Sequence, residues 1–294
     1  MNKHKIYILL LFFLSLNAYA NSYYDNFYSD FHNSSKTFTD PSDMIEENFR
    51  DPDEINLPWI NALVRIPLKN GDIYRGSIKD IKGEEKFLKK KYKTIIYLHG
   101  CAGHWAGTAK RIDFFANNGY AVIAPPSMAR KKYAQSCDTA TNRGGLYRSV
   151  LKIRKIDAEN AVLQAKKLSW TDRNNIFLIG LSEGGIATAT YEPKNKELSV
   201  SGRVVEGWTC NAGWDEYRGL KTPYNEPVLS LVAKYDPWFQ LDVLKGHCGQ
   251  FANKNPLSKS IIIDDGTQLS KSHGLMHDSK IKEITLDFLE KISK

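Results

Sequence analysis

The alternation of apolar and polar residues predicts a repeat of strands and helices over most of the chain. Short apolar runs bounded by glycine or charged residues predict strands, and apolar residues at helical spacing predict helices. After a hairpin at 62–68 and 73–78 around Asn70-Gly71, strands are expected at 94–98, 120–124, 176–179, 203–207, 228–233 and 261–263. Helices are expected at 109–118, 149–168, 186–190 and 279–292. This order predicts an α/β fold, a doubly wound and mostly parallel sheet with helices on both faces.

Residues 1–20 have the composition of a signal peptide. Basic residues at 3–5 precede an apolar core at 6–16, and Ala18-Tyr19-Ala20 fits the small-residue cleavage rule. The apolar core is short for a bilayer span, although an uncleaved membrane anchor is the alternative. No cysteine follows the core, so a lipoprotein-type anchor is not expected. We therefore expect export to the periplasm or the medium, a mature chain that begins near Asn21, and no transmembrane segment after signal removal.

The mature chain divides into an N-terminal arm and one large domain. Residues 21–57 are rich in Tyr, Phe, Asn, Ser and Asp and lack clear periodicity, which predicts an extended arm, packed on the domain or mobile. Residues 58–294 suffice for one α/β domain without a large lid. The net charge of +8 comes from scattered Lys and Arg, and the basic runs 89–91 and 130–132 are interpreted as solvated faces. No nucleic-acid-binding motif is present.

The strand at 176–179 ends in Gly180-Leu181-Ser182-Glu183-Gly184, which fits the pattern G-x-S-x-G. In this pattern a sharp strand-to-helix turn holds the serine in a strained conformation, and the flanking glycines leave room for the close approach. The serine oxygen then lies at the amino end of a helix, where negative charge is favoured. Ser182 is therefore the candidate nucleophile, the alternative being an ordinary Gly-Ser turn.

A second turn, His99-Gly100-Cys101-Ala102-Gly103-His104, follows the strand at 94–98. A His-Gly turn at this place is where such folds build an oxyanion hole. We expect the backbone N–H groups of Cys101 and Glu183 to form it and to stabilise a tetrahedral intermediate. His99, Cys101 and His104 also raise the alternative of a metal site, but no second cluster with ligand spacing exists, so no metal is expected.

The chain order predicts the partners of Ser182. The acid of a Ser–acid–His triad follows the next-to-last strand and the histidine follows the last one. Asp236 comes directly after 228–233, with Asp215 as the alternative. His273, in Ser272-His273-Gly274, is the preferred base, and His277 is the alternative nearer the last helix.

These motifs together resemble the dienelactone hydrolase-like branch of the α/β-hydrolase superfamily. The resemblance rests on 99–103, 119–123, Cys137, 154–158 and 180–185. It implies an eight-stranded sheet, a Ser- or Cys-based triad, no cofactor and hydrolysis of an ester or related acyl bond. Dienelactone hydrolases proper carry a Cys nucleophile where this chain has Ser182, so their lactone specificity is not carried over. Within the region, Arg154 and Asp157 lie one helical turn apart and are predicted to form an ion pair.

The resulting functional prediction is an exported, carboxylesterase-like serine hydrolase acting on a small-molecule acyl substrate. An exopeptidase or amidase of the same fold is one alternative, and a catalytically silent secreted binding protein on a hydrolase scaffold is another. Insertions at 127–147, 209–226 and 237–258 are expected to build the substrate groove, with aromatic residues Trp105, Trp208, Trp214, Trp238 and Phe239 on its face. The natural substrate and oligomeric state are not indicated.

Four cysteines lie in the exported part, and an even number in an oxidising compartment suggests disulfides. Three pairings are possible by count. Position favours Cys101–Cys137 and Cys210–Cys248, because each pair lies in loops that follow neighbouring strands. The alternative is four buried free thiols.

Overall fold

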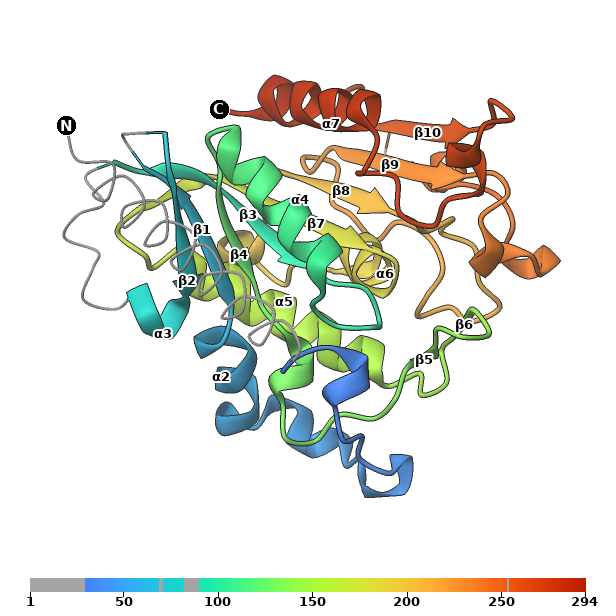
Figure 1. Ribbon diagram of the computed structural model, residues 1–294, viewed down its shortest axis with the longest axis horizontal. Helices are drawn as coiled ribbons and strands as arrows, with labels where there is room; N and C mark the ends of the chain where they lie inside the picture. The colour runs from blue at the N-terminus through green and yellow to red at the C-terminus, as the bar shows by residue number, and fades with distance from the viewer. Residues whose placement is uncertain (1–29, 69–70, 82–89, 253) are drawn as a thin grey trace, which may run out of the picture.

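The fold is centred on one eight-stranded sheet (Figure 1). The computed structural model describes residues 30–68, 71–81, 90–252 and 254–294. The strands are β1 (Leu63–Pro67), β2 (Ile73–Ser77), β3 (Tyr92–Leu98), β4 (Ala121–Ala124), β7 (Thr171–Leu181), β8 (Gly202–Glu206), β9 (Val228–Ala233) and β10 (Lys259–Ile263), in the order β10-β9-β8-β7-β3-β4-β1-β2. β1 is antiparallel to both of its neighbours, and the other adjacent pairs are parallel. The predicted mostly parallel α/β sheet is thereby confirmed.

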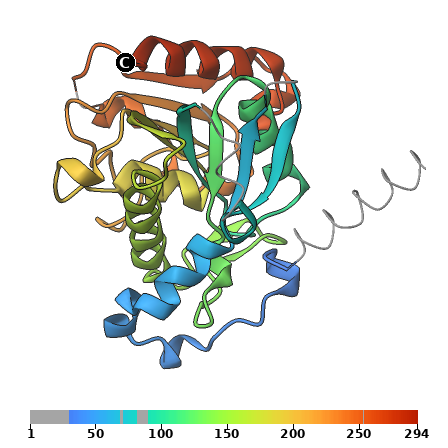
Figure 2. The same ribbon diagram turned by 90° about the vertical axis from the view of Figure 1, so that its left-hand side faces the viewer.

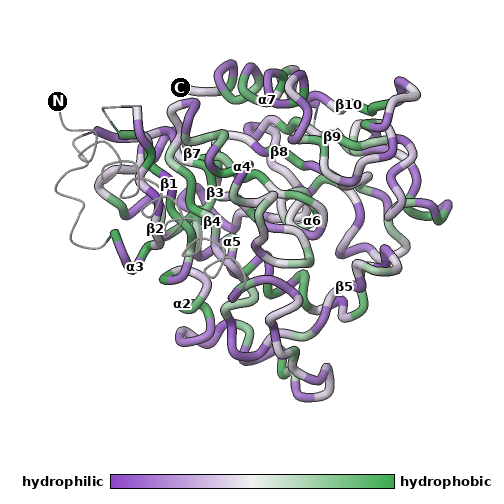
Figure 3. The backbone as a smooth tube through the Cα atoms, viewed as in Figure 1, coloured by the Kyte–Doolittle hydropathy of each residue, from purple (hydrophilic) through white to green (hydrophobic). Residues whose placement is uncertain are grey.

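Helices cover both faces of this sheet. The hydrophobic core on one face includes side chains of α4 (Ala106–Asn117) and α7 (Ser279–Ile292), and the core on the other includes those of α5 (Val150–Ala165) and α6 (Glu183–Thr190). In β7, Phe177 and Ile179 belong to the first core, whereas Ile176 and Leu178 belong to the second. Burial on both sides explains the unbroken apolar run. Figure 3 shows apolar stretches concentrated along the central strands.

The segment predicted as an extended arm has helical structure in its described part. It contains the 3-10 turns η1 (Asn33–Ser35), η2 (Pro41–Asp43) and η3 (Glu46–Arg50), followed by α2 (Pro52–Ile60), which packs against α5 (Figure 2). Two Asp-Pro pairs explain these turns, because Asp40 and Asp51 cap the starts of η2 and α2, and proline is favoured at a first helical position. Met44 and Phe49 are buried against α5.

Most of the remaining short elements lie in loops that follow the carboxyl ends of the parallel strands; the exceptions are α3, which follows β2, and η6, which precedes β8. The short elements are β5 (Cys137–Asp138), β6 (Arg143–Gly144), α3 (Ile78–Ile81), η5 (Ser127–Ala129), η6 (Lys196–Leu198), η7 (Pro237–Phe239), η8 (Asp242–Leu244), η9 (Cys248–Phe251) and η10 (Gln268–Lys271). The predicted signal peptide, Asn70 and the connection at 82–89 fall outside the described residues. None of the helices in the described ranges combines the length and apolarity needed to cross a bilayer.

Candidate active site

Ser182 lies in the sharp turn between β7 and α6. Its backbone has φ of 58° and ψ of −121°, a strained conformation for a residue with a side chain. The flanking glycines are required by contact, since a Cβ atom on Gly180 would lie 2.1 Å from the carbonyl oxygen of Gly184, and one on Gly184 would lie 2.1 Å from that of Leu98. The N–H of Ser182 donates to the carbonyl oxygen of Glu206 at 2.9 Å, which fixes the turn against β8.

His273 and Asp236 form a hydrogen-bonded pair. Nδ1 of His273 lies 2.7 Å from Oδ2 of Asp236, whose other oxygen accepts from the N–H of Trp238 at 3.0 Å. Trp238 stacks on the imidazole with ring centroids 5.1 Å apart. The other imidazole nitrogen, Nε2, is buried and forms no hydrogen bond within the described residues. The pair therefore presents a free Nε2 while Asp236 holds the proton on Nδ1.

The imidazole and the serine both lie against the end of β8. Gly207 follows Glu206, the hydrogen-bond partner of Ser182, and a Cβ atom on Gly207 would lie 2.6 Å from the carbonyl oxygen and 3.5 Å from Cε1 of His273. Gly207 has φ of 62° and leaves room for the histidine. His273 Nε2 and Ser182 form no hydrogen bond with each other in this structure, and catalytic hydrogen bonds in hydrolases are often long before substrate binds.

The loop that bears His273 is held by a buried ion pair that the sequence analysis missed. Glu206 accepts from the N–H groups of Leu275 and Met276 at 2.5 and 2.8 Å, and pairs with Arg111 of α4 at 2.9 Å. Burial alone would raise the pKa of Glu206, but Arg111 and the two N–H donors lower it overall, so the carboxylate is ionised. An acidic residue at the end of a fully buried strand was the available signal.

The His99–His104 loop lies beside Ser182. A Cβ atom on Gly100 would lie 3.5 Å from Cβ and 4.0 Å from Oγ of Ser182, so the backbone of this loop packs on the serine. Glu183 is the first residue of α6, where backbone N–H groups have no intrahelical acceptor. The described N-terminal segment braces the same loop, since Asn33 N–H donates to Ala102 O at 2.7 Å and His104 N–H donates to Phe31 O at 3.0 Å.

Arg154 lies behind this loop and corrects a prediction. It donates to the carbonyl oxygen of His99 and contacts its imidazole, with 2.8 Å from a guanidinium nitrogen to Nε2. Asp157 pairs with Arg130 at 2.6 Å and not with Arg154. The predicted Arg154–Asp157 pair is thus wrong, as is the interpretation of Arg130 as solvated, because Arg130 is 2% exposed. Helical spacing correctly placed Arg154 and Asp157 on the same face of α5, but the ion-pair partner of Asp157 comes from another loop.

The two histidines of the loop are neutral and buried. Nδ1 of His99 lies 2.6 Å from Gly100 O and Nε2 accepts from the N–H of Ser127, an arrangement that assigns the proton to Nδ1. Burial and the nearby Arg154 hold the pKa of His99 well below its usual value. Burial, with Arg154 and Arg65, lowers the pKa of His104 to about 3.

A cavity of about 310 Å³ opens on Ser182. All three predicted insertions contribute to its lining. The insertion at 127–147 contributes Ser136, Gly144 and Gly145, the one at 209–226 contributes 212–214 and Tyr217, and the one at 237–258 contributes 238–239, 241 and 243–244. Of the five predicted aromatic residues, Trp208, Trp214, Trp238 and Phe239 line the cavity, and Trp105 does not. The walls are mainly apolar, with the side chains of Glu183 and Ser136 among the few polar ones.

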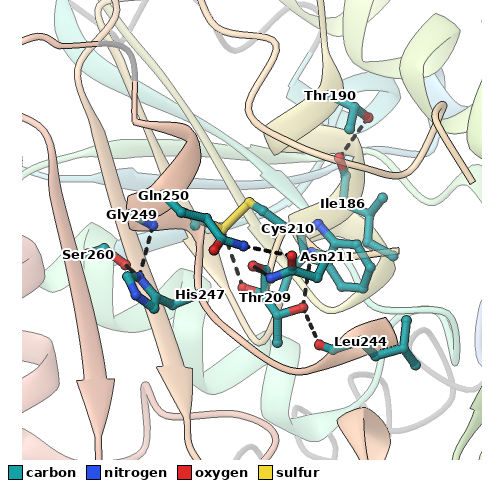
Figure 4. Close-up of a disulfide and its surroundings, with 12 residues drawn as sticks. Ile186, Thr190, Thr209, Cys210, Asn211, Leu244, His247, Gly249, Gln250 and Ser260 are labelled. Atoms are coloured by element: carbon teal, nitrogen blue, oxygen red, sulfur yellow. Dashed lines mark hydrogen bonds between the residues drawn. A yellow bond between two sulfur atoms is a disulfide. The ribbon is translucent and has the colours of Figure 1, made fainter. Parts of the chain in front are cut away.

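Two disulfides connect the loops around the cavity, in the pairs that position favoured. Cys101–Cys137 joins the His99–His104 loop to β5, with the Cα atoms 6.0 Å apart. Cys210–Cys248 joins the loop after β8 to the insertion after β9 (Figure 4). Beside it, Thr209 Oγ1 donates to Leu244 O at 2.6 Å. All four cysteines are paired in the structure, in contrast to the alternative of four free thiols.

The alternatives for the acid, the base and a metal site find no support in the described residues. Asp215 and His277 are both exposed, and His277 directly precedes Asp278, the N-cap of α7. Cys101 is in a disulfide and cannot join His99 and His104 as a metal ligand. Across the described residues, no group of three or more His, Cys, Asp or Glu side chains is arranged to hold a metal ion.

No protein-family model matches the chain, and no curated protein matches it. Among solved structures, it is similar to a putative dienelactone hydrolase from Klebsiella pneumoniae (13% identity over 69% of this chain and 88% of that one, TM-score 0.47). It is also similar to a dienelactone hydrolase-like promiscuous phosphotriesterase from metagenomic libraries (14% identity over 70% of this chain and 89% of that one, TM-score 0.49). A third similar structure is an esterase of Pyrococcus furiosus (16% identity over 68% of this chain and 82% of that one, TM-score 0.46). At identities this low, the similarity concerns the fold and not the activity.

Proposed function

We propose that the protein is an exported serine hydrolase that cleaves carboxylic esters. The observation that carries the proposal is the His273–Asp236 hydrogen bond of 2.7 Å, with a free Nε2, beside a serine held in a strained turn. A buried carboxylate that fixes the tautomer of an imidazole next to such a serine is the arrangement of a Ser-His-Asp triad.

The proposed mechanism gives each residue of the site a role. Oγ of Ser182 attacks the acyl carbon while Nε2 of His273 accepts its proton, and Asp236 stabilises the imidazolium through Nδ1–H. The N–H groups of Cys101 and Glu183 stabilise the oxyanion of the tetrahedral intermediate. His273 then protonates the leaving alcohol. In the second half, His273 takes a proton from water, which attacks the acyl-enzyme, and the acid leaves as Ser182 regains its proton.

Export is part of the proposal. It is supported by the signal-peptide pattern at 1–20 and by two disulfides, which persist in oxidising compartments and are rare in the cytosol. The prediction is that the mature protein begins near Asn21. N-terminal sequencing of the protein recovered from the periplasm or medium tests this directly.

Labelling with a fluorophosphonate probe tests the catalytic part. The wild-type protein should label at Ser182, and Ser182→Ala should abolish labelling and lower ester turnover by several orders of magnitude. A panel of alkyl esters, aryl esters and aminoacyl amides then separates an esterase from an amidase. Unchanged turnover in a folded Ser182→Ala protein contradicts the mechanism, and absence of labelling in the wild type favours a silent binding protein.

A further inference from the structure

Glu183 has a second feature besides its backbone N–H. Its side chain is 5% exposed and lines the cavity next to Ser182, the preceding residue. Oε2 of Glu183 is buried with no hydrogen-bond partner among the described residues. Since an unpaired buried carboxyl oxygen is costly, its presence in a cavity that holds substrate points to a partner group on the substrate.

Two hydroxyl groups accompany this carboxyl. The oxygen atoms of Tyr133 and Ser136 are buried and, in the described part of the chain, also lack hydrogen-bond partners. Both hydroxyls face the Glu183 carboxyl from beyond normal hydrogen-bond distance, and after Arg154 they oppose, as weak donors, the rise in its pKa that burial causes. The cluster Glu183–Ser136–Tyr133 thus offers a carboxyl acceptor beside hydroxyl groups that both donate and accept.

The rest of the cavity is apolar and mainly aromatic. Trp208, Trp214, Tyr217, Trp238 and Phe239 contribute to its walls. A ring or a branched apolar group fits between such side chains, and a few convergent polar groups then fix its orientation. A cationic substrate group is disfavoured by Arg154, whose positive charge already acts on the Glu183 carboxyl.

We propose that this cavity recognises esters whose apolar portion, aromatic in the best-fitting case, carries a hydroxyl group close to the scissile bond, and that Glu183 binds this hydroxyl. The inference rests on the proposed function and deepens it, because it names the substrate class of the same site. A hydroxyl matches the cluster since it donates to the carboxyl and accepts from Ser136 or Tyr133. Ser182 and Glu183 both line this cavity, so one substrate molecule can contact both side chains.

Matched ester pairs test the inference. In the acyl series, ethyl 3-hydroxy-3-phenylpropanoate is compared with ethyl 3-phenylpropanoate. In the alcohol series, 2-hydroxy-2-phenylethyl acetate is compared with 2-phenylethyl acetate. We expect kcat/KM for the hydroxyl-bearing ester to exceed that of its counterpart about tenfold or more in one series, the value of one well-formed hydrogen bond to a buried group. The series that responds identifies the half of the ester that occupies the cavity.

Three variants locate the effect. Because Glu183 also supplies an oxyanion N–H, the readout is the ratio of the two kcat/KM values within each variant, which cancels changes in the catalytic machinery. Glu183→Met should bring the ratio close to one, whereas Glu183→Gln, which keeps an acceptor oxygen, should retain part of it. Ile186→Val, elsewhere on the cavity wall, is the matched control and should keep the wild-type ratio. Fluorophosphonate labelling verifies that each variant is folded and reactive.

The outcomes separate the two proposals. A wild-type protein that labels at Ser182 and has ratios near one in both series overturns this inference alone. A larger kcat/KM for the 3-amino-3-phenylpropanoate ester than for the 3-hydroxy ester, lost in Glu183→Gln, overturns the hydroxyl assignment in favour of an ammonium group. A protein in which Ser182 neither labels nor supports ester cleavage overturns the proposed function and this inference with it.

Discussion

The buried imidazole of His104 gives the protein a pH dependence of stability that can be calculated. The side chain is fully buried, and neither ring nitrogen has a hydrogen-bond partner among the described residues. Burial, with Arg154 and Arg65, lowers its pKa to about 3, whereas an unfolded chain has a histidine pKa of about 6.5. Between these values the unfolded state binds a proton that the folded state does not, so stability is complete above pH 6.5 and falls as the pH decreases.

The size of the effect follows from the distance to pH 6.5. A pH of 5 is about 1.5 units below the pKa of a histidine in the unfolded chain, so protonation stabilises the unfolded state by about 2 kcal/mol for one histidine. The pKa of His99 is lowered in the same direction by burial and Arg154, so this residue adds to the loss of about 2 kcal/mol that His104 causes between pH 7 and 5. This is a large share of the 5–15 kcal/mol of a typical domain.

The assay is guanidinium chloride unfolding of the oxidised protein at pH 7, 6 and 5. His104→Leu and His104→Gln both remove the titrating group, so each should lose about 2 kcal/mol less than the wild type over this range. The comparison uses the difference between pH values, because the absolute stability also changes with packing. Two variants of different polarity that agree identify titration as the cause. If both lose as much stability as the wild type between pH 7 and 5, the reasoning is wrong.

Three further predictions concern the active-site loops. His273→Ala should lower activity as much as Ser182→Ala does, and the double variant should be no worse than either single variant. His277→Ala should have little effect. Steady-state ester hydrolysis measures these differences, and the reverse ranking of the two histidine variants would assign the role of base to His277. Mass spectrometry of the unreduced protein should find no alkylatable thiol, and four alkylatable thiols would contradict the pairing. Each disulfide should contribute about 3–4 kcal/mol to the free energy of unfolding, measured by chemical denaturation under oxidising and reducing conditions. Glu206→Gln should destabilise the protein by about 3–5 kcal/mol, because it leaves Arg111 as an uncompensated buried charge; a change below about 1 kcal/mol in urea unfolding would mean that Arg111 finds another partner.

The sequence predicted those features that local pattern determines. The helix at 279–292 and the strand at 228–233 have the predicted bounds, because apolar spacing and flanking polar residues define both. The turn at Ser182 was predictable for a similar reason, since the close contacts at Gly180 and Gly184 admit glycine alone. The positions of the cysteines after neighbouring strands similarly limited the disulfide pairs.

What the sequence did not indicate depends on contacts between distant segments. Glu206 pairs with Arg111, 95 positions away, and Arg130 pairs with Asp157, 27 positions away. Neither sequence separation corresponds to the period of a helix or a strand, so no local pattern indicates these pairs. For the same reason the sequence does not distinguish a basic run that contains a buried arginine from a run that is fully solvated. The helical N-terminal segment was missed for another reason, because its turns depend on single Asp-Pro pairs and not on periodicity.

Buried charges on both sides of Ser182 have a common consequence for the site. Glu206 accepts two N–H groups of the loop that bears His273, and Arg154 donates to the carbonyl oxygen of His99 in the opposite loop. Because desolvation offsets most of the Coulomb energy, such groups contribute little net stability. They do require particular backbone orientations, since a buried charge is stable only when its hydrogen bonds are made. The sheet and disulfides therefore supply stability, whereas these buried charges determine where the proposed base and the proposed oxyanion donors lie relative to Ser182.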